Sequence, residues 1–482
     1  MAGSWSPWSI ISNAGTLSGG RLMLAVLRFL ATLVILQRAG LERFGEFALI
    51  LSVVAVAEWL SDFGLSDVAV RQIVADPSRK RLTLGAFALS KLAQGALAAT
   101  CLMAGMSLAG YSHDVVQAAQ IGAVAVLCHA GIQVYRVEFR VRMQMGREVG
   151  AELLATIVFL AAVWAVTGAD ASLQSLAGCY LLLRVVNLVA AGALARSWPD
   201  LGFEQGWRTE LTVLLRACVP LGLTGLMVST YDAMEQVALS QWSSSAEVGT
   251  YSFAMRVMML ALIVQQALAT AAFPLLAAQW AQNRAAFLRT QQTVLDWGLL
   301  ISGAMFCALH TSASSLVALI KHDPEGIAQV LQWLVWAIPA RAAVALVGPV
   351  LLISGQLGRA VWIPLMVLVV KWLALMVLAE RGALGAAAAF LVAEVGIGLL
   401  LNLLFCQYAS GVWLRWSVAI KIMLAALAVV GGVQLLGLSG TLLQGLIAAA
   451  AFLALSALIG AVRLQELKQL VLTVAARRTG RT

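Results

Sequence analysis

The sequence predicts an all-α polytopic membrane protein with about fourteen transmembrane helices. Of its 482 residues, 61% are hydrophobic, only 11% are charged, and the mean hydropathy is +0.90. A soluble globular protein carries about 25% charged residues. The apolar residues are collected in fourteen stretches, each long enough to cross a bilayer, which takes about 17–25 helical residues.

The predicted spans follow one another with short connections. They cover residues 14–36, 45–66, 82–110, 115–135, 151–168, 173–195, 217–241, 249–280, 296–320, 327–353, 361–379, 384–406, 416–438 and 441–462. The longest connection, near residues 196–210, is too small to be a domain. The sequence therefore leaves no room for a soluble catalytic domain between the spans.

Basic residues alternate between the two sides of the predicted bundle. The connections after even-numbered spans and the C-terminal tail hold twenty: Arg71, Arg79, Lys80, Arg81, Arg136, Arg140, Arg142, Arg147, Arg196, Arg208, Arg216, Arg284, Arg289, Arg359, Arg415, Arg463, Lys468, Arg477, Arg478 and Arg481. The other connections hold only four: Arg38, Arg43, Lys321 and Arg381. The positive-inside rule places the basic side, and with it both termini, in the cytoplasm. The net charge of +9 then belongs mainly to a face that meets anionic headgroups, and no nucleic-acid partner is expected.

A weak internal repeat divides the spans into two bundles. Residues 42–49 (ERFGEFAL) and 246–253 (AEVGTYSF) open the second and eighth spans with an offset of 204, which pairs Gly45 with Gly249. We therefore expect two pseudo-symmetric six-helix bundles, residues 1–205 and 206–410. Residues 411–482 add two further helices and a basic cytoplasmic tail. Transporters made of two such bundles bind substrate between them.

Two arginines in the first span need an explanation. Arg21 and Arg28 lie seven residues apart, so they share one helical face. A charge at the bilayer centre is unfavourable by about 2.5–3.5 kcal/mol on insertion scales. The pair therefore predicts a face that meets something other than lipid.

Opposite charges occur in the seventh span. Under the repeat offset, Arg28 aligns with Asp232, and Glu235 follows three residues later on the same predicted face. One interpretation is a structural ion-pair lock between the bundles. The other is a water-filled cationic cavity for an anionic head group, with the two carboxylates as a gate or proton-coupling site.

The remaining charges within spans fall into two groups. Arg256, Arg341 and Lys371 are candidates for the same cationic cavity. For Lys91, Arg184 and Lys421 we expect snorkelling toward an interface. For Asp62 we expect a local pair with Arg71.

Cysteine and histidine residues do not predict a metal site. The six cysteines are single residues in or beside apolar segments, and none of the four histidines has a metal-ligand spacing. No GxxxxGK[ST] motif occurs, so direct use of ATP is not expected. We expect no cofactor.

An ordered set of short motifs resembles a known family. Residues 36–73 read LQRAGLERFGEFALILSVVAVAEWLSDFGLSDVAVRQI. Four residues of this run carry much of the resemblance: Gly45, Asp62, Gly64 and Arg71. Residues 248–257 (VGTYSFAMRV), with Gly249, look like the counterpart in the second half, and 352–360 and 382–395 follow in order. The chain resembles the Wzx-type polysaccharide flippases, a branch of the multidrug/oligosaccharidyl-lipid/polysaccharide exporter (MOP) superfamily.

The resemblance implies a function. Such a flippase moves an undecaprenyl-diphosphate-linked oligosaccharide from the cytoplasmic to the outer leaflet of the inner membrane by alternating access, for O-antigen, capsule or exopolysaccharide synthesis. Arginine suits a diphosphate because it binds oxygens through bidentate, charge-assisted hydrogen bonds. By position, the candidate ligands are Arg21, Arg28, Arg256, Arg341 and Lys371. Membrane lipids are expected partners, and a polysaccharide polymerase and a chain-length regulator are further candidates.

Two alternatives remain open. A cation-coupled multidrug exporter of the same superfamily usually has twelve spans and a more acidic cavity, which the basic residues and the two extra spans disfavour. A membrane polysaccharide polymerase is expected to have a large external loop, and none is predicted here. We therefore expect a transporter and not an enzyme.

Overall fold

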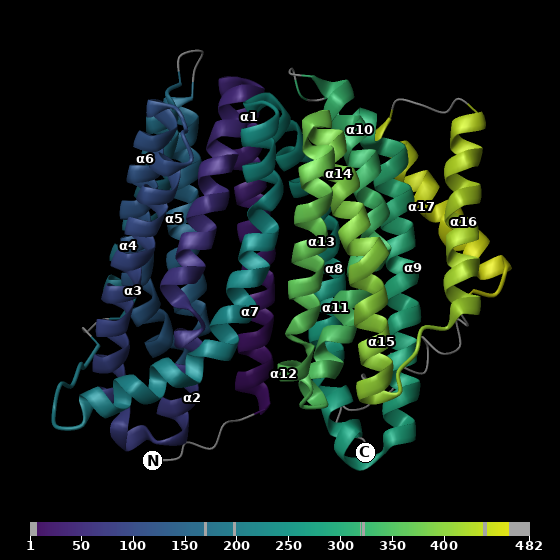
Figure 1. The fold of residues 1–482 in the computed structure, drawn as a ribbon. Helices are drawn as coiled ribbons and strands as arrows, with labels where there is room; N and C mark the ends of the chain where they lie inside the picture. Colours follow the sequence, from purple (N-terminus) through teal and green to yellow (C-terminus); the bar gives the residue numbers. More distant parts are fainter. Residues whose placement is uncertain are drawn as a thin grey trace. The chain divides into compact units, whose positions relative to one another are not determined.

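The computed structural model describes residues 7–167, 171–195, 199–318, 320, 323–436 and 441–461, and these form helices with no strand among them (Figure 1). The basic tail predicted beyond residue 461 lies outside the described residues. The chain divides into two compact units, Met1–Ser252 (unit 1) and Phe253–Thr482 (unit 2). The predicted fold class, an all-α polytopic membrane protein, is confirmed.

Unit 1 contains seven complete helices and the beginning of an eighth in its described part. They are α1 (Pro7–Asp62), α2 (Leu65–Ala75), α3 (Lys80–Leu108), α4 (His113–Val141), α5 (Met145–Val166), α6 (Leu173–Ala195), α7 (Trp207–Trp242) and α8 (Ser245–Gln282), with a short 3₁₀ turn, η1 (Pro77–Arg79), before α3. Helix α4 packs along α3 and α6, and α1 packs along α5 and α7. The seventh span therefore groups with unit 1 by packing, whereas the predicted repeat places it in the second bundle. That repeat stays a prediction.

Helix α1 is two transmembrane helices joined at Gly40. Its 56 residues would extend about 84 Å as one straight helix, far beyond a bilayer core of about 30 Å. Gly40 has φ 86° and ψ 171°, a region that essentially only glycine occupies. Gly382 joins α13 and α14 with a similar backbone, φ 71° and ψ −156°. These two glycines let consecutive spans follow each other without a loop.

The corner after α1 also depends on glycine. Phe63 and Gly64 have φ of 44° and 73°, and Gly64 precedes α2. A Cβ on Gly64 would lie 2.7 Å from the Leu221 Cβ on α7. A Cβ on Gly222 would lie 2.2 Å from the Phe63 ring. The Asp62–Gly64 segment thus forms a tight turn that packs directly against α7. This close contact requires glycine on each of the two segments, Gly64 in the turn and Gly222 on α7.

Unit 2 contains the rest of α8 and the remaining helices. They are α9 (Arg284–Val317), α10 (Pro324–Leu334), η2 (Val335–Ala337), α11 (Ile338–Ile353), α12 (Leu357–Ala360), α13 (Trp362–Leu378), η3 (Ala379–Arg381), α14 (Gly382–Leu391), η4 (Val392–Gly398), α15 (Leu399–Ser410), α16 (Trp416–Leu435) and α17 (Leu442–Leu458). The segment η4 is a π-helix that joins α14 to α15 in one span.

The two C-terminal helices belong to the core of unit 2. Helix α9 packs against both α16 and α17, and small residues permit the close crossing with α17. A Cβ on Gly303 would lie 2.5 Å from the Phe452 ring. A Cβ on Gly445 would lie 2.8 Å from the Ala308 carbonyl oxygen. The extra spans are therefore integral to this unit.

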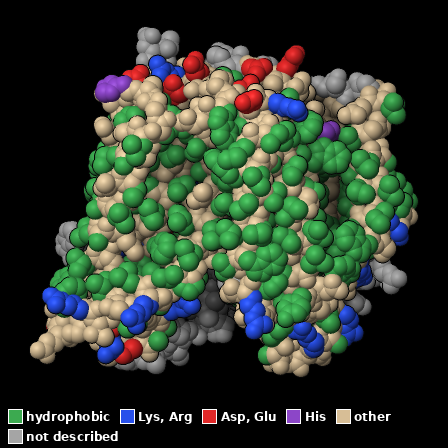
Figure 2. Space-filling view, viewed as in Figure 1, with side chains coloured by type: hydrophobic (Ala, Val, Ile, Leu, Met, Phe, Trp, Pro, Cys, Tyr) green, Lys and Arg blue, Asp and Glu red, His purple; other side chains and the backbone are tan. Residues whose placement is uncertain are grey.

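The predicted spans match the observed helices. Eleven helical stretches of the described chain are long and apolar enough to cross a membrane. Two of these, Gly19–Ala75 and Gly358–Ser410, each cover two predicted spans, and the last predicted span is the shorter apolar helix Leu443–Leu458. Figure 2 shows apolar side chains over the middle of each unit, as expected for surfaces that face lipid.

Candidate functional site: a cationic pocket in unit 1

A polar pocket of about 330 Å³ lies between α1, α4 and α5. Its charged lining consists of four arginines and two glutamates: Arg21, Arg28, Arg136, Arg140, Glu148 and Glu152. Each helix contributes two of them, seven residues apart on α1 and four apart on α4 and α5. These spacings place each pair on one helical face, so three charged faces converge.

Glu152 joins α1 to α4 through two arginines. Arg28 Nη2 donates to Glu152 Oε1 at 2.5 Å, and Arg136 Nη2 donates to Glu152 Oε2 at 2.9 Å. The carboxylate is 18% exposed, whereas the Arg28 side chain is 50% exposed. Glu152 therefore holds Arg28 in place while half of the Arg28 side chain remains exposed.

Glu148 makes the equivalent contacts one helical turn away. Arg140 donates to it from Nε at 3.3 Å and from Nη2 at 3.2 Å, and Arg136 Nε lies 3.6 Å from it. Each glutamate thus serves two arginines. Among the described residues Arg21 forms no ion pair. The pocket lining has four positive and two negative charges, an excess of two that favours an anionic ligand.

The structure brings the sequence-predicted pair Arg21 and Arg28 into this pocket, and it adds residues that the sequence analysis missed. Arg136 and Arg140 were assigned to a connection, but α4 continues to Val141, so both lie on a helix and face the pocket. The i, i+4 spacing of Glu148 and Glu152 near the start of the next span is the sequence signal that could have revealed the two glutamates.

A second cationic group lies in unit 2. Arg341 on α11 bonds Glu394 at 3.1 Å, and Glu394 lies in the π-helical segment η4. The Phe390 ring centroid lies 5.6 Å from the Arg341 guanidinium carbon and 5.4 Å from the Lys371 Nζ. The structure therefore brings Arg341 and Lys371 together around one aromatic ring. π-Helical segments frequently occur at functional sites.

The remaining predicted residues are Arg256, Asp232 and Glu235. Arg256 is half-buried on α8 in unit 2. On α7, Asp232 is exposed whereas Glu235 is 1% exposed, so the two carboxylates are in different environments. The ion-pair partner of Arg28 in unit 1 is Glu152. A gate formed by Arg28 with Asp232 remains a prediction.

Three predictions for charged residues within spans are wrong, and the first two concern Lys91 and Asp62. Lys91 does not snorkel: it is 1% exposed, and its Nζ pairs with Asp62. Asp62 therefore pairs with Lys91 and accepts from Ser66, not from Arg71, which is exposed. Both corrections have one cause, because a charge on a neighbouring span offers compensation inside the membrane.

Arg184 is likewise buried and does not snorkel. Its Nη2 pairs with Glu58 at 2.6 Å and donates to the Tyr180 hydroxyl at 2.7 Å. The Tyr180 hydroxyl donates to Glu58 at 2.9 Å, and His129 Nδ1 lies 3.9 Å from that carboxylate. This network ties α1, α4 and α6 together in unit 1.

The repeat glycines contact each other. A Cβ on Gly45 would lie 1.7 Å from the Ser245 carbonyl oxygen and 2.8 Å from the Gly249 nitrogen. A Cβ on Gly249 would lie 2.4 Å from the Leu41 carbonyl oxygen. The backbones of α1 and the first turn of α8 therefore touch at this crossing. No group of three His, Cys, Asp or Glu side chains in the described residues is arranged to hold a metal ion.

Comparison with known protein families identifies the family of this chain. Residues 10–280, more than half of the sequence, match the model of the family described as polysaccharide biosynthesis protein. The chain belongs to this family. No curated protein matches it. Among solved structures, the lipid II flippase MurJ in an inward closed conformation is similar, with a TM-score of 0.77 at 12% identity, over 92% of this chain and 98% of that chain.

Multidrug transporters share the fold more distantly. An inward-facing MATE family transporter of the MOP superfamily has a TM-score of 0.63 at 15% identity, over 81% of this chain and 96% of that chain. An outward-facing MATE transporter has a TM-score of 0.57 at 15% identity, over 84% of this chain and 95% of that chain. The chain therefore has the fold that these flippase and transporter structures of the MOP superfamily share, as the sequence motifs predict.

Proposed function

We propose that this protein flips an undecaprenyl-diphosphate-linked oligosaccharide from the cytoplasmic to the outer leaflet of the inner membrane. The observation that carries the proposal is the excess of arginine over glutamate in the cationic pocket of unit 1. A diphosphate is the anionic part of such a cargo, and arginine binds phosphate oxygens bidentately.

The pocket is suited to exchange of one anion for another. Arg28 and Arg140 are 50% and 29% exposed, so they retain donors that the glutamates do not use. A diphosphate takes up these donors. It either displaces the Glu152 carboxylate from Arg28 or shares the Arg28 guanidinium with that carboxylate. Arg256, Arg341 and Lys371 are the proposed cationic residues of unit 2, and Asp232 and Glu235 are proposed as gate or proton-coupling residues.

The distribution of charge supports the direction of transport. Figure 2 shows Lys and Arg side chains gathered at the lower end of each unit and most of the visible acidic side chains at the upper end. Basic residues mark the cytoplasmic side of a membrane protein. We infer that the lower ends are cytoplasmic, where a lipid-linked oligosaccharide assembled on nucleotide-sugar donors is available. A polysaccharide polymerase and a chain-length regulator are the proposed partners on the product side.

The test replaces Arg28 in cells that depend on this protein for surface polysaccharide. Arg28→Ala is expected to abolish export while membrane levels of the protein stay normal. Arg28→Lys is expected to restore part of it, because an ammonium keeps the attraction but loses the bidentate geometry. Arg43→Ala is the matched control, since Arg43 lies in α1 beyond the Gly40 junction, outside the pocket, and pairs locally with Glu46. Normal export by Arg28→Ala would refute the role of the pocket.

The fold shared with MATE transporters keeps a second candidate, a cation-coupled multidrug exporter. The two candidate functions, flippase and multidrug exporter, predict different losses in the Arg28→Ala strain. A flippase variant loses surface polysaccharide and accumulates lipid-linked intermediates, whereas an exporter variant becomes sensitive to cationic dyes and keeps its polysaccharide.

A further inference from the structure

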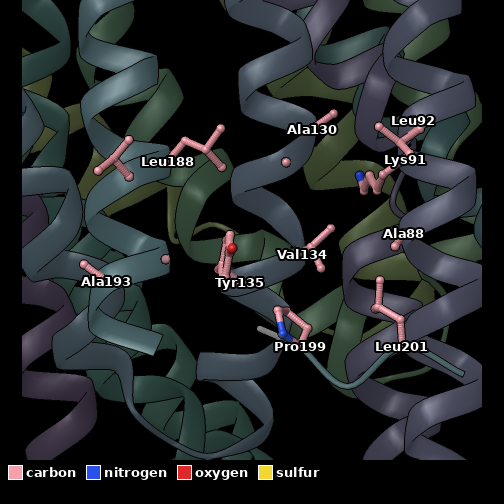
Figure 3. Close-up of a pocket in the computed structure, with 13 residues that line it drawn as sticks. Ala88, Lys91, Leu92, Ala130, Val134, Tyr135, Leu188, Ala193, Pro199 and Leu201 are labelled. Carbon is pink, nitrogen blue, oxygen red and sulfur yellow. The ribbon is translucent and has the colours of Figure 1, made fainter. Parts of the chain in front are cut away.

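A second pocket in unit 1 has the opposite chemistry. It measures about 760 Å³ and lies between α3, α4 and α6, and we call it the α3–α6 groove. Figure 3 shows α4 as its floor, with Ala130, Val134 and Tyr135, between α3 on one side and α6 on the other. Lys91 and Tyr135 supply the only polar side chains among its thirteen lining residues. The Lys91 ammonium is already paired with Asp62, so it is not free for a ligand.

The α3–α6 groove and Arg81 at its lower end together span about one leaflet. Pro199 and Leu201 line its lower end, where the Gly202 N–H donates to the Arg81 carbonyl at 2.8 Å. Leu92 lines its upper part and lies eleven residues after Arg81 on α3, a rise of about 16 Å. That is half of a hydrocarbon core of about 30 Å. The top of the groove and Arg81 are therefore separated by about the thickness of one leaflet, at the basic end of unit 1.

The groove opens sideways to the membrane. Its flanking residues Leu92 and Val189 are 65% and 66% exposed and lie within transmembrane helices. Its volume is in the range of about 300–1,000 Å³ typical of ligand sites. An acyl chain that enters gains little hydrophobic free energy, because it leaves an equally apolar solvent. The polar groups at the lower end of the groove, which we call its mouth, must therefore decide which lipid binds.

The mouth carries one cation between two anions. Arg81 Nε lies 3.1 Å from Asp200 Oδ1, and Arg81 Nη1 lies 3.8 Å from Glu204 Oε1. All three side chains are more than half exposed, at 58%, 67% and 71%. Such exposed pairs contribute little to stability, so a ligand can exchange with them easily. A headgroup with a phosphate for Arg81 and a primary ammonium for the two carboxylates matches this pattern.

We propose that the α3–α6 groove is a binding site for a phosphatidylethanolamine of the leaflet at the basic end, with one acyl chain in the groove. Its phosphate binds Arg81, and its ammonium donates to Asp200 and Glu204. Phosphatidylglycerol lacks the ammonium, and phosphatidylcholine has no N–H to donate. This inference is independent of the cargo and of the cationic pocket.

The test measures which lipids the full-length protein keeps. Purified protein is equilibrated in micelles with equal amounts of phosphatidylethanolamine, phosphatidylglycerol and phosphatidylcholine, and bound lipid is counted by native mass spectrometry. We expect at least fivefold enrichment of phosphatidylethanolamine. Asp200→Asn combined with Glu204→Gln should remove the enrichment without unfolding the protein, because both side chains lie at the surface.

A pair of neighbouring substitutions tests the groove itself. Ala193→Trp fills it from α6 and should lower phosphatidylethanolamine binding at least fivefold. Leu194→Trp adds the same indole next to the groove and should leave binding unchanged, since Leu194 does not line it. Equal retention of the three lipids by the wild-type protein, or equal effects of the two tryptophans, would overturn the proposal. So would displacement of phosphatidylethanolamine by undecaprenyl phosphate, which would make the groove a site for the polyprenyl tail.

Discussion

The buried pair of Lys91 with Asp62 leads to a quantitative prediction for Asp62→Asn. Lys91 is 1% exposed, and its ammonium is held by Asp62 and by the Ser61 carbonyl oxygen at 3.2 Å. The substitution removes the compensating charge but leaves the ammonium inside. Breaking a buried pair from one side destabilises a protein by about 3–5 kcal/mol. For a unit of about 250 residues, this corresponds to a fall in Tm of roughly 6–20 °C.

The measurement is thermal unfolding of the purified protein in detergent, with Asp67→Asn as the matched control. Asp67 is 67% exposed and lies 3.5 Å from Arg140, so its loss should change Tm by less than about 2 °C. Asp62→Leu combined with Lys91→Met removes both charges and should recover most of the lost stability. An Asp62→Asn protein that melts with the wild type would refute the inference that this pair is buried and compensating.

Three further predictions concern the helix junctions and the orientation. Gly45→Ala should lower the free energy of unfolding by at least about 3 kcal/mol, the upper end of ordinary overpacking, because the new Cβ would lie 1.7 Å from a carbonyl oxygen. Gly40→Ala should lower the free energy of unfolding by about 1–3 kcal/mol through backbone strain. Gly105→Ala is the control for both glycines and should not lower it, because its new Cβ would meet no atom within 4 Å. Chemical denaturation measures all three variants. In a cysteine-free background, a cysteine at Glu247 should react with an impermeant maleimide in intact cells and one at Arg284 only after permeabilisation. Reversed labelling would contradict the proposed direction of transport.

The helices were predictable from the sequence because the bilayer imposes a length and a composition on every span. Hydropathy placed the fourteen apolar stretches on helices, and it separated the two halves of α1 around Gly40. The boundaries were less certain at polar ends. Arg136 and Arg140 looked like loop residues because arginine usually ends an apolar stretch, whereas α4 continues through both.

The candidate site was predictable only in part, since periodicity shows which residues share a face but not which helix lies opposite. Arg21 and Arg28 were recognised as one face, and their acidic neighbours on α5 were not. Lys91 and Arg184 were misjudged for the same reason. Their partners Asp62 and Glu58 are on another helix, and each buried cation is stabilised by contacts far apart in the sequence.

The crossing of Gly45 with Gly249 has a genetic consequence. When a large side chain is introduced at most helix crossings, a smaller residue opposite can restore the space, and such compensating pairs are found as suppressors. Here the atoms opposite Gly45 are the backbone of Ser245 and Gly249, and those opposite Gly249 include the Leu41 carbonyl. No substitution across the interface can make a carbonyl oxygen smaller. Revertants of a Gly45 variant should therefore restore glycine itself or alter residues elsewhere that shift a whole helix.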